Sequence, residues 1–514
     1  MSAKAFWHVS FVLLVLALVA TPAIAMDDFF VDAINGDDIN GDGSAGNPWR
    51  TITHSVQLLP AGTHRILIAP GVYDLGHGET FPIEPPLGTT LESTDGREVT
   101  RIVGPLDRPV IRQIGGNNPR TVLSGLTIEG GSDGVWAEGP GSSLGMTIAN
   151  TTISGSARAC VYSKQQVGIG ATDTILRGAT YGWLHDSSTI GGVGLYDSVI
   201  SDCLADGIRV DHRGTTFRFN IVRSVVTNNG GFGLWQRGHN QAITSATIDN
   251  SIVSFNAAGG VRSVSYLGCG GTCAPWTSVG LAESTVYGNG ASTGFGGLER
   301  VGDSPFHFCV ISTSISWGNL GLDNTNFDPS FSNIGTGHKT GGGMISGDPR
   351  FVDGPGGDFR LLPTSPCIDR LAPTATSNYD HENEPRPTDG NGDGDFKSDM
   401  GADELHTFVA PGVPPVTGSP FYFIAGGPVT ERGQLLTVLL SHDDGAKTGG
   451  IRLPGSGGLT VNLAPGLLFQ TGLMLLPALQ TTLRAGRTTE TPTVTLPPNP
   501  FDPKIYFAGV AFDI

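Results

Sequence analysis

Charged residues are scarce in this chain of 514 residues, at 15% of the sequence, against about 25% in average soluble proteins. Helix signals are also rare, whereas 76 Gly and 34 Pro interrupt regular structure at short intervals. The sequence therefore disfavours a protein built from solvated helices and favours short strands joined by turns.

The chain also lacks an excess of positive charge, because 30 Lys and Arg stand against 47 Asp and Glu, a formal charge of −17. This balance disfavours nucleic acid as a partner. Between residues 205 and 265 the balance reverses, with six Arg against three Asp. Such a belt would attract an anionic ligand such as a polyuronate or a sulfated glycan. Alternatively, several of these Arg side chains are solvated or pair with neighbouring strands.

No apolar stretch is long enough to cross a bilayer. Residues 1–25 instead have the pattern of a signal peptide, with Lys4 in the positive region and a small-residue cleavage site that ends at Ala25. We therefore expect a secreted protein, extracellular or held at the cell surface without a transmembrane span, and a monomer.

Cysteines number only six, and their spacing supports little of a disulfide framework. Cys269 and Cys273 share one loop and are predicted to form a disulfide. Cys160 and Cys203 fall at corners about 10 Å apart, which is too far for a bond. Cys309 and Cys367 have the sequence context of small buried hydrophobic residues.

A short phrase recurs eight times between Leu126 and Asn319, and each copy has a small polar residue, then aliphatic residues, then a turn. The copies follow one another at 22 to 33 residues. A period of this length means that each repeat must stack on its neighbours to bury its apolar face. Short β-branched runs bounded by Gly, Asn and Ser predict strands, so the stack is predicted to be a parallel β-helix.

Two columns of side chains follow from this register. A second phrase in each repeat pairs an aliphatic residue, which should point inward, with a residue that should face solvent. The predicted outward column consists of Trp136, Tyr162, His185, Arg209, Trp235, Arg262 and Glu299. The turns carry Asn229, Asn256, Asn289 and Asn319 at one equivalent position. Stacked amides can bond from one coil to the next, so we expect this second column to be structural.

Both flanks of the repeats resemble a known family. Residues 29–73, with VDAINGDDINGDGS, NPWRTI and LIAPGVY, are similar to the N-terminal domain of unknown function of bacterial right-handed parallel β-helix proteins in the pectate-lyase-like superfamily. Residues 345–404, with GDPRF, DFRL, SPCID and DMGADE, are similar to the closing module of secreted β-helix proteins of the choice-of-anchor Q type. The resemblance implies a right-handed, all-β solenoid and export. It implies no particular activity, because the superfamily contains lyases, hydrolases, epimerases and adhesins.

These observations divide the chain into six parts. They are a signal peptide (1–25), an N-terminal cap with the first coils (26–120), the β-helix repeats (121–345), a closing module (346–408), a Pro/Gly linker (409–420) and a small C-terminal β-sandwich (421–514). The role of the last part is left open between sorting, surface attachment and glycan binding.

Two runs have the Asp-x-Asn-x-Asp-Gly pattern with which loops wrap oxygen ligands around calcium. The stronger candidate comprises Asp389, Asn391, Asp393 and Asp395. The weaker one runs from Asp38 to Asp42. Neither run has a bidentate acid at its twelfth position, and the alternative for both is side-chain capping of tight turns. We predict calcium at the run from Asp389 to Asp395 and no organic cofactor.

The predicted catalytic residues are Arg209, Asp211, His212 and Arg237. Alternation aims Arg209 and Asp211 outward and places Arg237 over Asp211. A uronate lyase needs a base near the proton α to the carboxylate and a cation that offsets the enolate charge. A hydrolase needs two acids, and alternation predicts that Asp186 points inward or lies in a bend. The pattern therefore favours a lyase over a glycoside hydrolase, with an Arg–Asp ion pair between coils as the structural alternative.

Three functions remain in contention. The first is binding of an extracellular, acidic polysaccharide through the column from Trp136 to Glu299, where aromatic rings could pack against sugars. The second is a polysaccharide lyase that acts on a polyuronate. The third is an adhesin or spacer without catalysis.

Overall fold

A computed structural model describes residues 27–115, 120–187, 190–267, 274–290, 296–371, 377–390 and 396–405, together with the short strands β31 (Gly450–Arg452) and β32 (Thr460–Asn462). The predicted signal peptide, the linker and most of the C-terminal domain lie outside these ranges. Among the described residues, no helix is long and apolar enough to cross a membrane.

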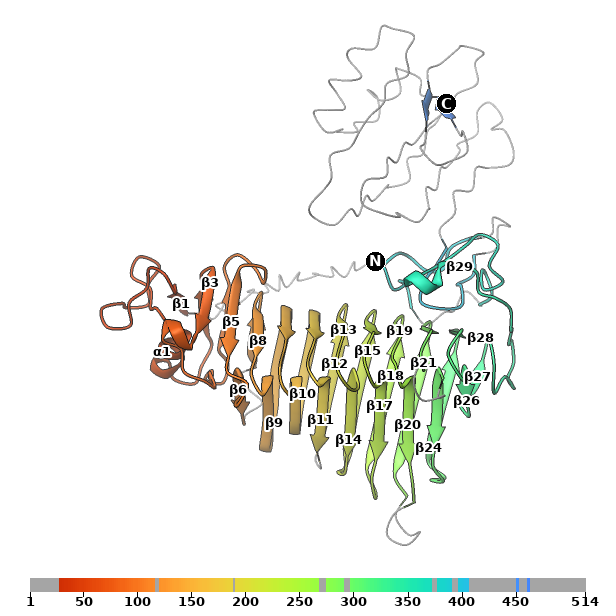
Figure 1. The fold of residues 1–514 in the computed structure, drawn as a ribbon, viewed down its shortest axis with the longest axis horizontal. Coiled ribbons are helices and arrows are strands. Elements are labelled where there is room, and N and C mark those ends of the chain that lie inside the picture. The colour runs from red at the N-terminus through yellow and green to blue at the C-terminus, as the bar shows by residue number, and fades with distance from the viewer. Residues whose placement is uncertain are drawn as a thin grey trace, which may run out of the picture.

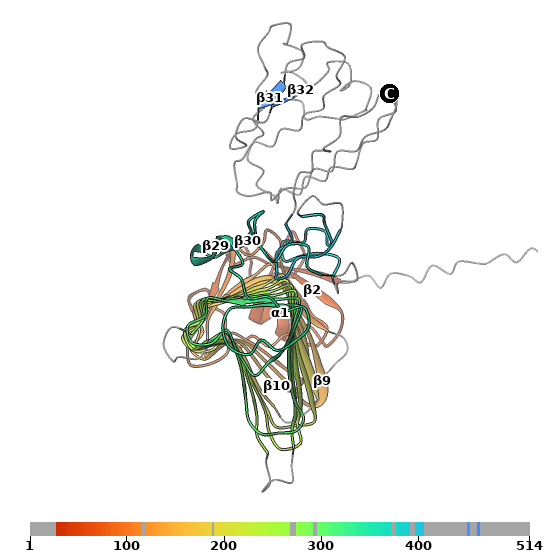
Figure 2. The same cartoon turned by 90° about the vertical axis from the view of Figure 1, so that its right-hand side faces the viewer.

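The described chain is an elongated parallel β-helix, as the repeats predict (Figure 1). A view along its axis shows the coils stacked in register (Figure 2). Each full coil contributes a strand to each of three faces, which we name A, B and C. Two long strands, β9 (Asp133–Ser154) and β10 (Ala159–Arg177), run through all three faces.

The strands of each face pair in parallel. Face A contains β6 (Ile111–Ile114), β11 (Tyr181–Ser187), β14 (Ile208–His212), β17 (Phe232–Gly238), β20 (Gly259–Ser265), β23 (Leu298–Val301) and β26 (Asn324–Thr325). Face B contains β1 (Asp27–Val31), β2 (His64–Ile68), β4 (Thr90–Ser93), β7 (Thr121–Ser124), β12 (Gly191–Tyr196), β15 (Thr216–Val222), β18 (Ile243–Asp249), β21 (Trp276–Ala282), β24 (His307–Ser312) and β27 (Asp328–Ser330). Face C contains β3 (Gly71–Asp74), β5 (Thr100–Gly104), β8 (Thr127–Gly130), β13 (Val199–Ser201), β16 (Val225–Thr227), β19 (Ile252–Ser254), β22 (Thr285–Tyr287), β25 (Ile315–Trp317) and β28 (Asn333–Ile334).

One continuous core fills the coil from Val31 to Ile334. The helix α1 (Ile52–Leu58) lies at the N-terminal end of the stack (Figure 1), where it buries Ile52 and Val56 in this core. A 3-10 turn, η1 (Leu75–His77), follows β3. The helix covers an end that would otherwise expose open strand edges.

Two ladders of side chains bond the coils together inside the turns. Asn229 Nδ2 donates to Asn256 Oδ1 at 2.8 Å, Asn256 continues to Asn289 at 2.9 Å, and Asn289 continues to Asn319 at 2.9 Å. Asn319 then donates to Asp323 Oδ1 at 2.8 Å, so a carboxylate ends the predicted Asn ladder. A second ladder was not predicted. In it, the backbone N–H of each Ser donates to the Ser Oγ of the next coil, from Ser198 through Ser224, Ser251, Ser284 and Ser314 to Ser332.

The cysteines that the structure describes agree with expectation, because Cys160, Cys203, Cys309 and Cys367 are all free and buried. Cys269 and Cys273 lie outside the described residues, so their disulfide stays a prediction.

The closing module folds back over face C. Its hairpin of β29 (Phe351–Asp353), η3 (Gly354–Gly356) and β30 (Asp358–Leu361) is followed by irregular chain that packs a second small core around Ile315 and Met400. Gly401 N–H donates to Thr313 O at 3.0 Å, and Ala402 N–H donates to Thr285 Oγ1 at 3.1 Å.

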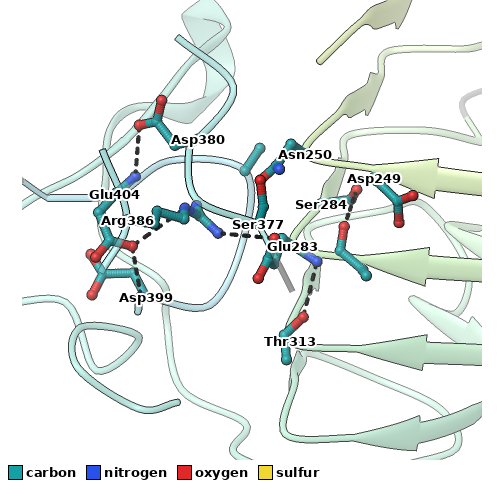
Figure 3. A network of polar contacts seen from close by, with 12 residues as sticks. Asp249, Asn250, Glu283, Ser284, Thr313, Ser377, Asp380, Arg386, Asp399 and Glu404 are labelled. Atoms are coloured by element: carbon teal, nitrogen blue, oxygen red, sulfur yellow. Dashed lines mark hydrogen bonds and ion pairs between the residues drawn. The ribbon is translucent and has the colours of Figure 1, made fainter. Parts of the chain in front are cut away.

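A buried guanidinium joins this module to the solenoid (Figure 3). Arg386 donates to Gly401 O at 2.9 Å, and its side chain has no exposed surface. It lies between Glu404, at 3.4 Å, and Glu283 in a turn of the solenoid, at 4.0 Å. The module is therefore fixed to the coil by a charge that water does not reach.

We expect Asn256→Ala to destabilise the solenoid by about 2–4 kcal/mol, because it leaves buried partners on both neighbouring coils without hydrogen bonds. Asn228→Gly is the matched control, since Asn228 is exposed and Gly keeps the left-handed backbone at its φ of 55°. Urea unfolding followed by circular dichroism measures the difference, and equal midpoints for the two variants would show that the ladder contributes nothing.

Candidate functional site

Face A carries the predicted outward column, with one correction. Strand register stacks Arg112, Trp136, Tyr162, Leu184, Arg209, Trp235, Arg262 and Glu299. Leu184 occupies the position predicted for His185, which is fully buried inside the coil. The inward position that the prediction gave to Leu184 is occupied by Trp183, whose indole N–H donates to Ser163 Oγ at 3.0 Å.

Guanidinium groups cover the aromatic rings of this column. Arg158 lies 3.8 Å from the ring centre of Tyr162 and 5.1 Å from that of Trp136, and it also pairs with Asp133 at 2.7 Å. Consequently Tyr162 is only 7% exposed, and the prediction that its ring faces solvent is wrong. Cation–π contacts therefore already occupy this part of the predicted aromatic surface.

Farther along the column the same arrangement recurs. Arg209 lies 3.9 Å from the ring of Trp235 and pairs with Asp206 at 2.8 Å. Arg262 pairs with Glu299 at 3.2 Å, and Glu299 is only 8% exposed. Burial raises the pKa of Asp206 and of Glu299 against the opposing effect of these cations. The alternative expectation for the Arg belt, pairing within and between coils, is thus confirmed for several of its members.

A second outward column holds a cluster of acids and bases, which we call the Asp211 cluster. Asp186, Asp211 and Arg237 stack on successive strands. Arg213 bridges the two carboxylates, with 2.9 Å to Asp186 and 3.2 Å to Asp211. His239 Nε2 contacts the other oxygen of Asp211. Within the described ranges no acid forms an ion pair with Arg237, so its charge is open to a ligand.

Asp186 therefore faces outward, against the prediction that it points inward or lies in a bend. Trp183 pairs in unbroken register with Val161 and Ile208, so the predicted alignment of β11 was one residue off and reversed the expected direction of its side chains. Arg213 pairs with both carboxylates, which places a shared cation beside the two acids that a hydrolase would need.

His212 does not belong to the surface cluster, and its predicted catalytic role is wrong. It is fully buried, and its ring lies 5.6 Å from Phe217 and 5.8 Å from His185. Burial lowers the pKa of His212 to about 4 and lowers the pKa of His185 well below its usual value. His239 is the histidine that a ligand on face A can reach, and its side chain is 21% exposed.

Of the predicted calcium run, Asn391, Asp393 and Asp395 lie outside the described residues, and only Asp389 is placed. In the weaker run Asp42 caps a turn, because its Oδ1 accepts from Ser44 N–H at 2.9 Å. The Asp38 carboxylate instead accepts from Arg50 N–H at 2.8 Å and from Thr51 Oγ1 at 2.7 Å, outside the run.

Sequence reasoning missed a different acidic group in the closing module, which we call the closing-module carboxylates: Asp380, Glu382 and Asp403. Each offers an oxygen within 4.8 Å of the others, which suits a hard cation. Glu382 and Asp403 also line a cavity of about 510 Å³ between the module and face C, beside Phe255 and Phe359. Asp403 is far along the sequence from Asp380 and Glu382, so no motif of regular spacing indicates that the three side chains meet.

Burial raises the pKa of several acids in this region. The pKa of Glu382 rises to about 8, and those of Glu384 and Glu404 rise to about 7. The pKa of Asp403 rises well above its usual value, through burial and the nearby charge of Glu382. The ionised forms of these groups repel one another, so a cation would stabilise them.

Comparison with known proteins identifies a matching family and solved structures with a similar fold. Residues 34–283 match the family described as "Protein of unknown function (DUF1565)". No curated protein matches the chain in sequence. The crystal structure of pectate lyase Pel9A is 15% identical, with a TM-score of 0.51 over 74% of this chain and 97% of that one. The mannuronan C-5 epimerase AlgE4 A-module of Azotobacter vinelandii is 15% identical, with a TM-score of 0.39, and the match covers 55% of this chain and 86% of the A-module. The likeness to Pel9A confirms the pectate-lyase-like β-helix and shows the fold alone.

The buried histidines predict acid lability. Unfolding returns the pKa of His212 from about 4 to about 6.5. The unfolded state therefore binds the extra proton between these values, and the contribution of His212 to stability falls as the pH drops from about 6.5 to 4, by about 3 kcal/mol at most. We expect His212→Leu to weaken this dependence, whereas His77→Leu at an exposed position should retain it. Urea midpoints at pH 7 and 4.5 measure the effect, and parallel behaviour of the two variants would contradict it.

Proposed function

We propose that the protein binds an acidic polysaccharide along face A of its β-helix and acts outside the cell. The observation that carries this proposal is the exposed Asp211 cluster with Arg237, next to the column in which guanidinium groups alternate with aromatic rings. Carboxylates of a polyuronate could pair with Arg237 and compete for Arg209 and Arg213. The fold shared with pectate lyase Pel9A supports this class of ligand.

A second candidate is a polyuronate lyase, which the contact between His239 and Asp211 favours. In such a reaction a base removes the proton from the carbon α to the carboxylate. The electron pair then forms a carbon–carbon double bond, and the glycosidic oxygen leaves with a proton. His239 and Asp211 are the groups that can move protons here, and Arg213 and Arg237 can offset the enolate charge. An increase in ultraviolet absorbance from an unsaturated uronate tests this chemistry directly.

Calcium binding by the closing module is also part of the proposal. The closing-module carboxylates supply the oxygen ligands that calcium prefers, and the predicted run from Asp389 to Asp395 adjoins them in sequence. Calcium would neutralise this group and hold the module on face C. No step of the lyase chemistry is assigned to this ion.

The double variant Arg209→Ala/Trp235→Ala should weaken binding of polygalacturonate about tenfold or more, since it removes a stacked cation–aromatic pair from the centre of face A. Arg223→Ala is the matched control, because Arg223 lies in a turn between faces B and C and pairs with Asp197 at 2.7 Å. Affinity electrophoresis at low and high salt measures the effect. If the double variant binds as the wild type does, face A is not the binding surface.

The raised carboxyl pKa values give the calcium proposal a pH signature. In the absence of calcium the folded module holds protons on Glu382 and Glu404 that the unfolded chain releases above about 4.3. The contribution of these two groups to stability should therefore fall as the pH rises from about 5 to 8. Calcium at a hundred times its Kd should add about 2.7 kcal/mol.

Thermal unfolding at pH 8, with calcium and with chelator, measures this stabilisation. Glu382→Gln/Asp403→Asn should raise the midpoint in chelator and abolish the calcium response, whereas Asp107→Asn at the other end of the molecule should behave as the wild type. A calcium response that survives the double variant would assign the ion elsewhere, and no response in any variant would rule it out for this module.

A further inference from the structure

Face B carries three exposed aromatic side chains near the C-terminal end of the solenoid, which we call the aromatic platform: Trp276, Phe306 and Phe308. Their exposed fractions are 47%, 42% and 45%. The rings of Trp276 and Phe306 are nearly parallel, with 4° between their planes and 5.6 Å between their centres. Phe308 adjoins Trp276 at 5.3 Å. Trp276 opens β21, Phe308 lies on the neighbouring strand β24, and Phe306 directly precedes β24.

The core does not explain these rings. On the same strands the inward positions are filled by Thr277, Val279 and Cys309, all of them buried. Strand register stacks Trp276 on Ile243 and Thr216, and it stacks Phe308 on Ser278, Ser245 and Arg218. The outward positions thus change from polar residues to an exposed Ile and then to aromatic residues, and the exposed Val310 extends the apolar surface.

The size of the platform restricts its occupant. An aromatic side chain has roughly 150–250 Å² of surface, so three rings at these exposures present roughly 200–350 Å². A stable protein partner, including a second copy of this chain, needs about 800 Å² from each side. The platform is too small for such an interface, whereas its area suits the apolar C–H faces of one or two sugar rings.

The surroundings of the platform agree with a sugar. Ser245 and Ser278 on the adjacent outward positions, and the hydrogen-bonded pair of Thr247 and Asn220, offer hydroxyl and amide groups at its border. In the coil before the platform, the corner between faces A and B is short, since β17 ends at Gly238 and β18 begins at Ile243, the residue that pairs with Trp276. The platform therefore begins one coil after the corner that follows Arg237.

We propose that the aromatic platform is a second carbohydrate subsite, which binds the apolar faces of pyranose rings without a requirement for charge. It rests on the proposed function for the class of ligand, but its contacts differ. Ring stacking is insensitive to salt, whereas binding to the Arg residues of face A is screened by it. Neutral chains should therefore bind at the platform alone.

The experiment uses the full secreted chain with two probes, the neutral cellohexaose and the acidic polygalacturonate. Trp276→Ala/Phe308→Ala should weaken cellohexaose binding about tenfold or more at both 20 mM and 500 mM NaCl, as isothermal titration measures it. Tyr379→Ala, which removes an exposed aromatic ring from the closing module, should bind cellohexaose as the wild type does. Arg209→Ala/Trp235→Ala should lose polygalacturonate and keep cellohexaose.

The outcomes separate the two proposals. Loss of polygalacturonate binding in the face A variant together with no cellohexaose binding by the wild type would overturn the platform and leave the proposed function standing. If cellohexaose binding depends on the platform but the face A variant binds polygalacturonate as the wild type does, the platform stands and the proposed function of face A is overturned. A change in oligomeric state on Trp276→Ala would assign the platform to self-association instead. Phe308→Ser, with its thermal midpoint checked against the wild type, replaces the double variant if that variant does not fold.

Discussion

Hydrogen bonding between identical positions of successive coils is the constraint on which this structure depends. Backbone pairing fixes the strand spacing at about 4.8 Å, and the Asn and Ser ladders repeat the same registration inside the turns. Because every coil must match the one below it, residues at equivalent positions form columns along the axis of the solenoid. Surface side chains are therefore arranged in lines, and a ligand that binds along such a line should itself be a repeating chain.

The two ends of the solenoid are covered by different structures. At the N-terminal end α1 covers the first coil with Ile52 and Val56. Near the C-terminal end the Asn ladder finishes on Asp323, and the closing module turns back over face C. Arg386 there shares its buried charge between Glu404 and Glu283. A buried ion pair of this kind contributes little net stability, but removal of one partner leaves an uncompensated charge, so it fixes one docking geometry.

The repeat phrases predicted the architecture and most of face A, because alternation and coil length act locally and leave a periodic trace. The prediction failed at β11. The pairs on neighbouring coils suggested Leu184 as the inward residue, yet Trp183 takes that position, and the directions of His185 and Asp186 change with it. Trp183 and Leu184 are both large and apolar, so the pattern does not reveal which of them points inward. The closing-module carboxylates were missed for a different reason, since Asp380 and Asp403 meet only through tertiary folding.

Pairing within face A shapes what kind of ligand it can bind. Arg158, Arg209 and Arg262 each have an acidic partner on the protein, at 2.7, 2.8 and 3.2 Å. A single carboxylate from a ligand would have to displace one of these partners or share its cation, and in water it would gain little by doing so. A polymer with a charge on every unit meets several such positions at once, and its later contacts form without further loss of translational freedom. Under the proposed function, face A would therefore discriminate by the length of an acidic chain more than by the identity of any one sugar.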